Sequence, residues 1–105
     1  MKIMTLIFLV VILTACSSSD GAIIGVNKLF NKGEYGAAIS KALHAESKYE
    51  YTPLQQAELD YIVAESYAKL NETDKSVAVY NHIVERYPDT KFALLSKTVL
   101  AKIQP

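Results

Sequence analysis

The sequence predicts an all-α fold of about five helices that pair into hairpins. From Ala22 onward, apolar residues recur at i, i+3 and i+4, the spacing that places them on one face of a helix. Glycine, proline, asparagine and aspartate residues fall between these stretches, where turns are expected. Residues 29–43 and 67–81 share one layout of helix end, tight turn and apolar-faced helix. We therefore expect one helical domain over residues 22–105.

The first two helices are predicted on either side of Gly33. The first covers 22–31, and Gly33 follows it, where a left-handed residue commonly ends a helix. The second covers 34–48, although Gly36 near its start costs about 1 kcal/mol relative to alanine. The residues expected to face the core are Ile23, Val26, Leu29 and Phe30 in the first helix and Ala38, Ile39, Ala42, Leu43 and Ala45 in the second.

The start of the third helix is the most sharply defined boundary in the sequence. Thr52 precedes Pro53, and Gln55 follows Thr52 by three positions. These residue types at this spacing form a capping box with a preorganised first turn. We therefore expect a helix over 53–70. Its apolar stripe is Leu59, Ile62, Val63, Tyr67 and Leu70, and its acidic residues, expected on a solvated side, are Glu58, Asp60 and Glu65.

Two more helices complete the predicted domain. Thr73 or Asp74 is expected to cap the fourth helix, which a proline ends. Asp89 and Thr90 are expected to cap the fifth helix, over 91–103. The residues expected to face inward are Val77, Tyr80, Ile83, Val84 and Tyr87 in the fourth helix and Phe92, Leu95, Val99 and Ile103 in the fifth.

The N-terminus has the layout of a secretory signal. Lys2 gives a basic start, and an apolar run covers residues 3–13. This run fits the apolar stretch of a signal peptide, about 7 to 15 residues, and is shorter than the roughly 20 residues of a membrane-spanning helix. We therefore expect residues 1–15 to be a signal peptide that is cleaved off, followed by a small, polar and flexible tether over 16–21.

The end of this signal resembles the lipobox of bacterial lipoproteins, with the residues Leu13, Thr14, Ala15 and Cys16. The resemblance implies a diacylglyceryl group on Cys16, cleavage before this residue and acylation of the new amino group. Several acyl chains anchor a protein stably, because each buried CH₂ contributes about 0.8 kcal/mol. Ser17 occupies the sorting position, where an Asp tends to retain Gram-negative lipoproteins in the inner membrane, so the outer membrane facing the periplasm is favoured. The alternative is a conventional signal peptide with an incidental cysteine.

The repeated hairpin resembles the tetratricopeptide repeat (TPR), and the spacing from Gly33 to Asn71 is close to its repeat of about 34 residues. The resemblance implies TPR-like hairpins in two and a half repeats, with the fifth helix as a C-terminal cap. Residues 78–103 also resemble, weakly, the repeats of much longer outer-membrane assembly lipoproteins and periplasmic coordinators. The second hairpin matches the TPR pattern at Val63-Ala64, Tyr67, Leu70, Tyr80 and Pro88, with Ser76 in place of Ala, and the first at Gly33, Tyr35, Ala38 and Ala45.

Composition and spacing argue against several classes of function. Eleven basic and eleven acidic residues balance, so the chain lacks the concentrated positive charge typical of nucleic-acid-binding proteins. Cys16 is the only cysteine, so no intramolecular disulfide or multi-thiolate metal site can form. His44 and His82 lie on different predicted helices, outside any metal or triad spacing. Because no nucleophile or acid–base motif occurs, we expect no enzyme, cofactor or small-molecule substrate.

The remaining class is a protein that binds other proteins. Stacked hairpins leave a concave face suited to extended or helical peptides, so we expect an adaptor that binds another cell-envelope protein, such as a pilotin or an outer-membrane assembly factor. The alternative is a self-associating envelope lipoprotein, for instance a homodimer, without a peptide ligand. The expected partner-binding residues lie on the third helix away from its apolar stripe, and they are Tyr61, Glu65 and Lys69.

Overall fold

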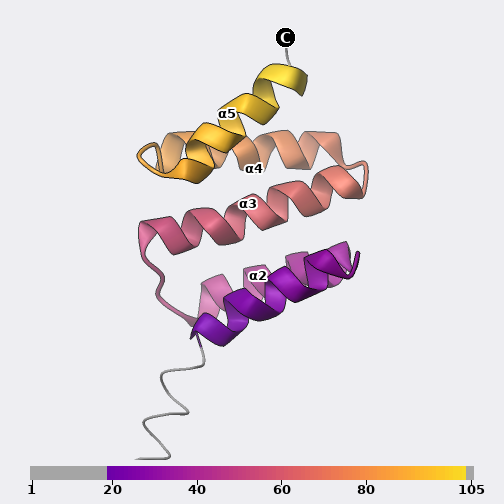
Figure 1. Cartoon of the computed structure of the whole chain (residues 1–105), viewed down its shortest axis with the longest axis vertical. Coiled ribbons are helices and arrows are strands. Elements are labelled where there is room, and N and C mark those ends of the chain that lie inside the picture. Colours follow the sequence, from indigo (N-terminus) through magenta and orange to yellow (C-terminus); the bar gives the residue numbers. More distant parts are fainter. Residues whose placement is uncertain (1–18, 104–105) are drawn as a thin grey trace, which may run out of the picture.

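A computed structural model describes residues 19–103, and its regular structure in this range is entirely helical (Figure 1). Five helices follow one another here without any strand, which confirms the predicted all-α fold of helical hairpins. The first helix covers 19–31, and the others are α2 (Tyr35–Lys48), α3 (Pro53–Lys69), α4 (Thr73–Arg86) and α5 (Lys91–Ile103). None of the helices in this range is both long enough and apolar enough to cross a membrane.

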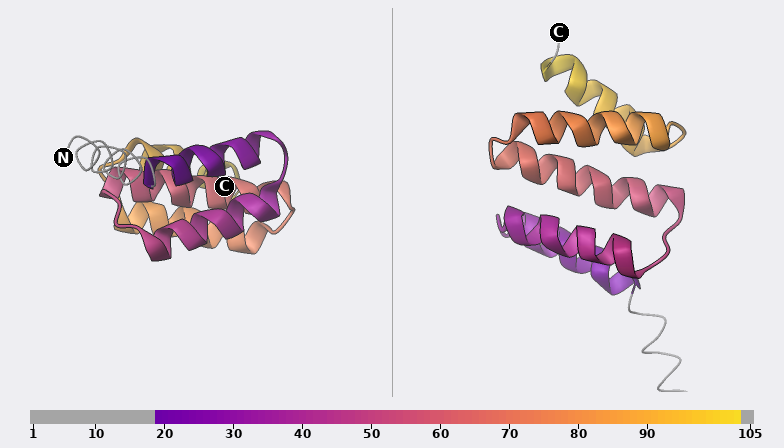
Figure 2. Two further views of the ribbon diagram at one scale, coloured as in Figure 1. Left: turned by 90° about the horizontal axis from the view of Figure 1, so that it is seen from below. Right: turned by 180° about the vertical axis from the view of Figure 1, so that it is seen from behind.

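The helices form a stack of two layers (Figures 1 and 2). In Figure 1 the first helix, α3 and α5 face the viewer, and we call them the front layer; α2 and α4 lie behind them as the back layer. The reverse view in Figure 2 shows α2 and α4 in front. α3 is central, because it contacts α2, α4 and α5. The first helix and α5 lie at opposite ends of the stack.

The two hairpins turn in the same way. Gly33 has a φ of 81°, and Asn71 has a φ of 61°, so the backbone of both residues has a left-handed conformation. The N–H of Glu34 donates to the carbonyl of Leu29 at 2.9 Å, and the N–H of Glu72 donates equivalently to Tyr67 at 2.9 Å. Each turn is thus a Schellman motif, which satisfies carbonyls left free at a helix end. The repeat seen in the sequence therefore corresponds to repeated backbone geometry.

Side-chain caps fix the starts of α3 and α5, as the sequence predicts. The Gln55 N–H donates to Thr52 Oγ1 at 3.2 Å, and the Thr52 N–H donates to Gln55 Oε1 at 3.1 Å, which completes the capping box. The Ala93 N–H donates to Thr90 Oγ1 at 3.2 Å. α5 has the predicted bounds, whereas α3 ends one residue early, with Leu70 as its C-cap.

Two predicted boundaries are wrong. The N-cap of α4 is Glu72, without a side-chain bond, because the Schellman turn leads directly into the helix and the carbonyl of Glu72 already accepts from Ser76. At the N-terminus, residues 19–21 are helical and not part of a tether. The hydroxyl of Tyr51 donates to the carbonyl of Ser19 at 3.1 Å, which holds this end of the first helix near the start of α3.

The core consists of two clusters joined through α3. The larger lies between the first helix, α2 and α3, and the smaller lies between α3, α4 and α5. The buried residues of the larger cluster are Val26, Ala38, Ile39, Ala42, Leu59, Ile62 and Val63. Those of the smaller cluster are Ala57, Ile83 and Ala93, and Tyr61, Val79, Tyr87 and Phe92 pack against them.

Four residues predicted to face inward are instead exposed: Leu43, Leu70, Leu95 and Ile103. Leu43 follows buried Ala42, and one helical step of 100° turns it away from α3. Leu70 has left the helix as its C-cap. α5 has neighbours only in α3 and α4 within the described range, so the edges of its apolar face stay open. Small residues, Ala93 and Ser96, fill its buried face instead.

Candidate functional site

The predicted contact residues lie on one face of α3 in the front layer. Tyr61, Glu65 and Lys69 follow one another at intervals of four residues, so the helix brings them together. Tyr61 is half-buried, and its ring packs edge-on against the Tyr80 ring, with 5.8 Å between the ring centres. It also packs against the Phe92 ring, tilted by 45° and with 5.6 Å between the ring centres. The expectation that Tyr61 lies away from the core is therefore wrong, because α5 folds back onto α3 and its Phe92 covers this ring.

Glu65 and Lys69 remain available to a ligand on this face. Lys69 is exposed, and Glu65 is half-buried beside Tyr61. Burial raises the pKa of the Glu65 carboxyl, and the charge of Lys69 opposes this rise. Within residues 19–103 no cation lies within 4 Å of the Glu65 carboxylate. Glu65 is thus a partly desolvated acid at an accessible surface, where a cationic group of a partner would be favourable.

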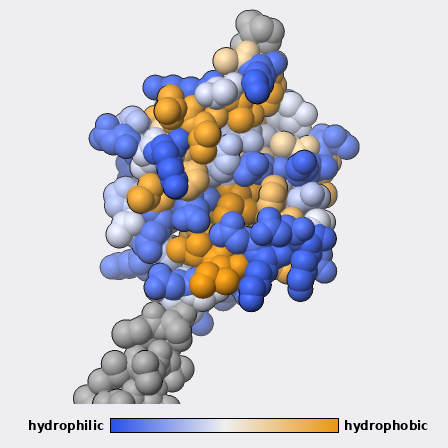
Figure 3. Space-filling model, in the orientation of Figure 1, coloured by the Kyte–Doolittle hydropathy of each residue, from blue (hydrophilic) through white to orange (hydrophobic). Residues whose placement is uncertain are grey.

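The front layer also carries exposed apolar side chains. Figure 3 shows hydrophobic patches on this face that alternate with hydrophilic side chains, from the first helix to α5. A mixed surface of this kind is typical of interfaces that form and dissociate, because their bulk hydrophobicity is close to that of the remaining surface. The large exposed apolar residues of the three front helices are Ile24, Leu54, Leu94, Leu95 and Ile103.

A pair of buried carboxyl groups lies where α2 meets α3. Asp60 is only 8% exposed, which contradicts its predicted place on a solvated acidic side. Glu46 Oε1 is shielded from solvent and accepts no hydrogen bond. Burial, a hydrogen bond with Asp60 and the charge of Asp60 together raise the pKa of Glu46 to about 8, while a hydrogen bond from Gln56 acts in the opposite direction. Glu46 is therefore mainly protonated at neutral pH and can donate to Asp60.

The same pair is approached by side chains from α3 and α4. Gln56 Nε2 donates to Asp60 Oδ1 at 3.4 Å, and His82 Nε2 lies 3.9 Å from Asp60 Oδ2. The His82 ring stands edge-on to Tyr87 at 6.0 Å. Burial, with the charges of Asp60 and Glu46, raises the pKa of the Tyr87 hydroxyl, while Arg86 opposes the rise. The arrangement can hold and share a proton, and it offers no activated nucleophile.

The buried pair is visible in the sequence only after the helical register is applied. Asp60 follows Ala57 by three positions and precedes Val63 and Ala64 by three and four. All three neighbours are buried, so Asp60 belongs to the buried stripe of α3. Because Asp60 is charged, a search for apolar residues at helical spacing does not include it. The need for a partner from α2 cannot be read from α3 alone, because Glu46 comes from another helix.

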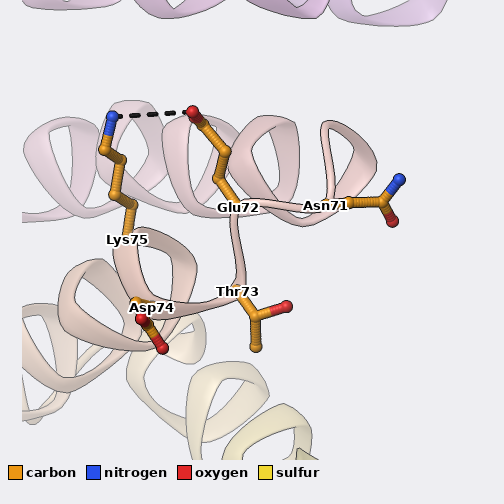
Figure 4. A pocket seen from close by; sticks show the side chains of 5 residues that line it. All are labelled: Asn71, Glu72, Thr73, Asp74 and Lys75. Atoms are coloured by element: carbon orange, nitrogen blue, oxygen red, sulfur yellow. Dashed lines mark ion pairs between the residues drawn. The ribbon is translucent and has the colours of Figure 1, made fainter.

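A shallow hollow lies at the turn between α3 and α4 (Figure 4). It is lined by the consecutive residues 71–75, all of which are exposed. Figure 4 shows the Glu72 and Lys75 side chains directed toward each other, and their ion pair measures 3.5 Å. Exposed pairs of this kind contribute little to stability. A hollow built from one turn, with no buried polar group aimed into it, is a weak candidate for a binding site.

The remaining predicted site residues, Leu13 to Cys16 and Ser17, lie outside the described residues. His44 and His82 are exposed on α2 and α4, as predicted. Over residues 19–103, no three His, Cys, Asp or Glu side chains are placed to bind a metal ion together. Comparison with protein-family models, with curated proteins and with solved structures finds no match for this chain.

Proposed function

We propose that this chain is an adaptor lipoprotein of the bacterial cell envelope, anchored through lipid on Cys16, whose TPR-like hairpins bind another envelope protein. In this proposal the protein acts without catalysis, as a pilotin or an outer-membrane assembly factor does. The observation that carries it is the face of α3 with Glu65 and Lys69, in a front layer that also carries exposed apolar residues. Protein surfaces with this mixture bind short peptide segments or single helices.

Glu65 indicates the chemistry of the bound segment. Because its carboxyl group is half-buried and has no cation within 4 Å among residues 19–103, a lysine or arginine of the partner would stabilise its charged form. Lys69, one turn away, is exposed and can pair with an acidic side chain of the same segment. We therefore expect a segment with both signs of charge, spaced to meet two successive turns of α3.

The anchor in this proposal is supported by the sequence of the N-terminus. A basic start, a short apolar run and the small residues before Cys16 occur in the order expected of a lipoprotein signal. The first helix lies at one end of the stack, so a lipid on Cys16 would hold that end close to the membrane. The front layer would then remain accessible from the side.

Site-specific photo-crosslinking in the native host tests the adaptor proposal. A photoreactive residue in place of Lys69 should give one discrete adduct with another envelope protein. The matched control carries the same residue in place of Glu85, which is exposed on α4 in the back layer and should give no adduct. Glu65→Gln should weaken the Lys69 adduct, because an amide cannot pair with a cation. Adducts from both positions, or from neither, would count against a binding face on α3.

A further inference from the structure

The outward face of α5 is open to solvent over most of its length. α5 contacts only α3 and α4, and it buries only Ala93 and Ser96. α3, which has neighbours on both sides, buries seven residues. On α5, Leu94 is 68% exposed and Leu95 is 44% exposed. We define the α5 outer surface as Lys91, Leu94, Leu95, Thr98 and Lys102, which lie on the side away from Ala93 and Ser96, together with exposed Lys97 at its edge, one turn after Ala93.

The α5 outer surface carries charge of one sign only. All charged residues of α5 are lysines, and none of the three forms an ion pair within residues 19–103. The helix dipole explains part of this pattern, because Lys97 and Lys102 lie toward the C-terminal end. It does not explain Lys91, the first residue of α5, where a cation is unfavourable. Lys91 Nζ lies 5.2 Å from the centre of the Phe92 ring, still without an acidic partner.

The packing of α4 on α3 indicates what could cover such a surface. α4 presents Ser76, Tyr80 and Ile83 as a buried stripe at intervals of three and four residues. A helix beside α5 would likewise place apolar residues over Leu94 and Leu95. Because Lys91 and Lys102 lie between these leucines around the helix and Lys97 lies beyond Leu94, the covering helix must bring acidic residues beside its apolar residues.

Two other occupants fit less well. A second copy that used the same surface would bring the lysines of both copies together, and like charges in an interface are unfavourable. A membrane surface would require a larger apolar face than the exposed Leu94, Leu95 and Ile103 of α5 provide. The α5 outer surface also lies at the end of the stack opposite the first helix.

We infer that the α5 outer surface docks an acidic amphipathic helix of a partner protein. This inference goes beyond the proposed function, because it assigns a second surface that is separate from Glu65 and Lys69 on α3. It does not depend on the lipid anchor. The leucines provide the apolar contact, and the lysines select partners with acidic flanks and orient them.

The test uses the full chain and a synthetic helical peptide with leucines at i, i+3, i+4 and i+7 and glutamates on both flanks. Fluorescence anisotropy of the labelled peptide should show saturable binding that weakens as salt is added. A control peptide, with lysine at each glutamate position, should bind about tenfold more weakly or worse, because like charges repel across the interface.

Variants of α5 locate the contact. Lys97→Glu combined with Lys102→Glu should weaken binding of the acidic peptide about tenfold, whereas Lys97→Arg with Lys102→Arg should preserve it. Leu94→Ser should also weaken binding, because it removes the most exposed apolar contact. These side chains are exposed, so the thermal unfolding midpoint of each variant should stay close to that of the parent chain.

Several results would overturn the inference. They are failure of the acidic peptide to bind, equal binding of both peptides, and loss of binding with Glu65→Gln but not with the Lys97 and Lys102 changes. Binding of anionic phosphatidylglycerol vesicles without binding of the peptide would instead make α5 a lipid contact. Self-association through α5 in sedimentation, again without peptide binding, would make it a contact between copies. The crosslink from Lys69 reports on α3, so either proposal can fail alone.

Discussion

The protonation state of the Glu46 side chain depends strongly on the groups around it. Its pKa of about 8 lies well above the ordinary value of 4.5, so the folded chain binds a proton that the unfolded chain releases between these two values. Folding stability therefore falls as pH rises from about 4.5 to 8. The groups that face Glu46 are Asp60 and Gln56 of α3 and, through Asp60, His82 and Tyr87 of α4.

Glu46→Gln should remove this pH dependence, because the amide resembles the protonated carboxyl group. At pH 8 to 9 we expect the variant to be more stable than the parent chain, by on the order of 1 to 2 kcal/mol, because solvent screens this partly exposed group. Urea unfolding at several pH values measures the difference. Glu85→Gln, a change at an exposed glutamate of α4, is the matched control and should leave the profile of the parent chain unchanged. A Glu46→Gln profile that still falls with pH would place the titration elsewhere.

At the scale of elements, the two Schellman turns define the hairpins. A Cβ added to Gly33 would meet no atom within 4 Å, so any effect of a substitution there comes from its left-handed backbone. Gly36, in the first turn of α2, also has open space around it, but its backbone is helical. Substitutions at these two glycines therefore distinguish two contributions to stability: the cost of a left-handed backbone conformation at Gly33 and the cost of a flexible residue in a helix at Gly36.

Substitution by alanine should have opposite effects at these two positions. Gly33→Ala should lower the free energy of unfolding by about 1 kcal/mol, because alanine is disfavoured at positive φ. Gly36→Ala should raise it by about 0.5 kcal/mol, because alanine is the better helix former. Chemical denaturation of both variants checks the signs. Destabilisation at both positions would mean that added bulk, and not backbone conformation, decides the outcome.

The helix boundaries were largely predictable from local sequence. The capping box at Thr52 and the cap at Thr90 act within three residues, so the starts of α3 and α5 could be predicted. The N-cap of α4 could not, because Glu72 lacks a preferred capping side chain and the left-handed Asn71 sets the start. The prediction of inward-facing residues was wrong for some apolar side chains, such as Leu43 and Leu95, because exposure depends on which neighbouring helix covers a face.

For the whole molecule, the order of the helices in the stack determines how an anchor would orient it. The first helix lies at one end, α5 lies at the other, and α3 lies between them. A lipid on Cys16 would therefore place the first helix near the membrane and the α5 outer surface away from it. Both proposed binding surfaces would then face the surrounding compartment, one at the side and one at the far end.

Labelling with a radioactive or alkyne-bearing fatty acid tests the anchor. The parent chain should incorporate label and fractionate with membranes, whereas Cys16→Ser should incorporate none and be lost from the membrane fraction. Ser17→Asp is the matched variant: in a Gram-negative host it should keep the label but move the protein from the outer to the inner membrane. Label that persists in Cys16→Ser would exclude this residue as the lipid attachment site.

The sequence by itself determined the all-α class, the helical hairpins and most helix ends, because caps, turns and apolar periodicity act over a few residues. It also supplied Cys16 and its neighbours as the basis of the proposed anchor. Only the tertiary structure decided that Asp60 is buried against Glu46, that Tyr61 is covered by Phe92 and that the leucines of α5 are open. Burial and pKa depend on side chains from other helices, and the spacing within one helix does not contain that information.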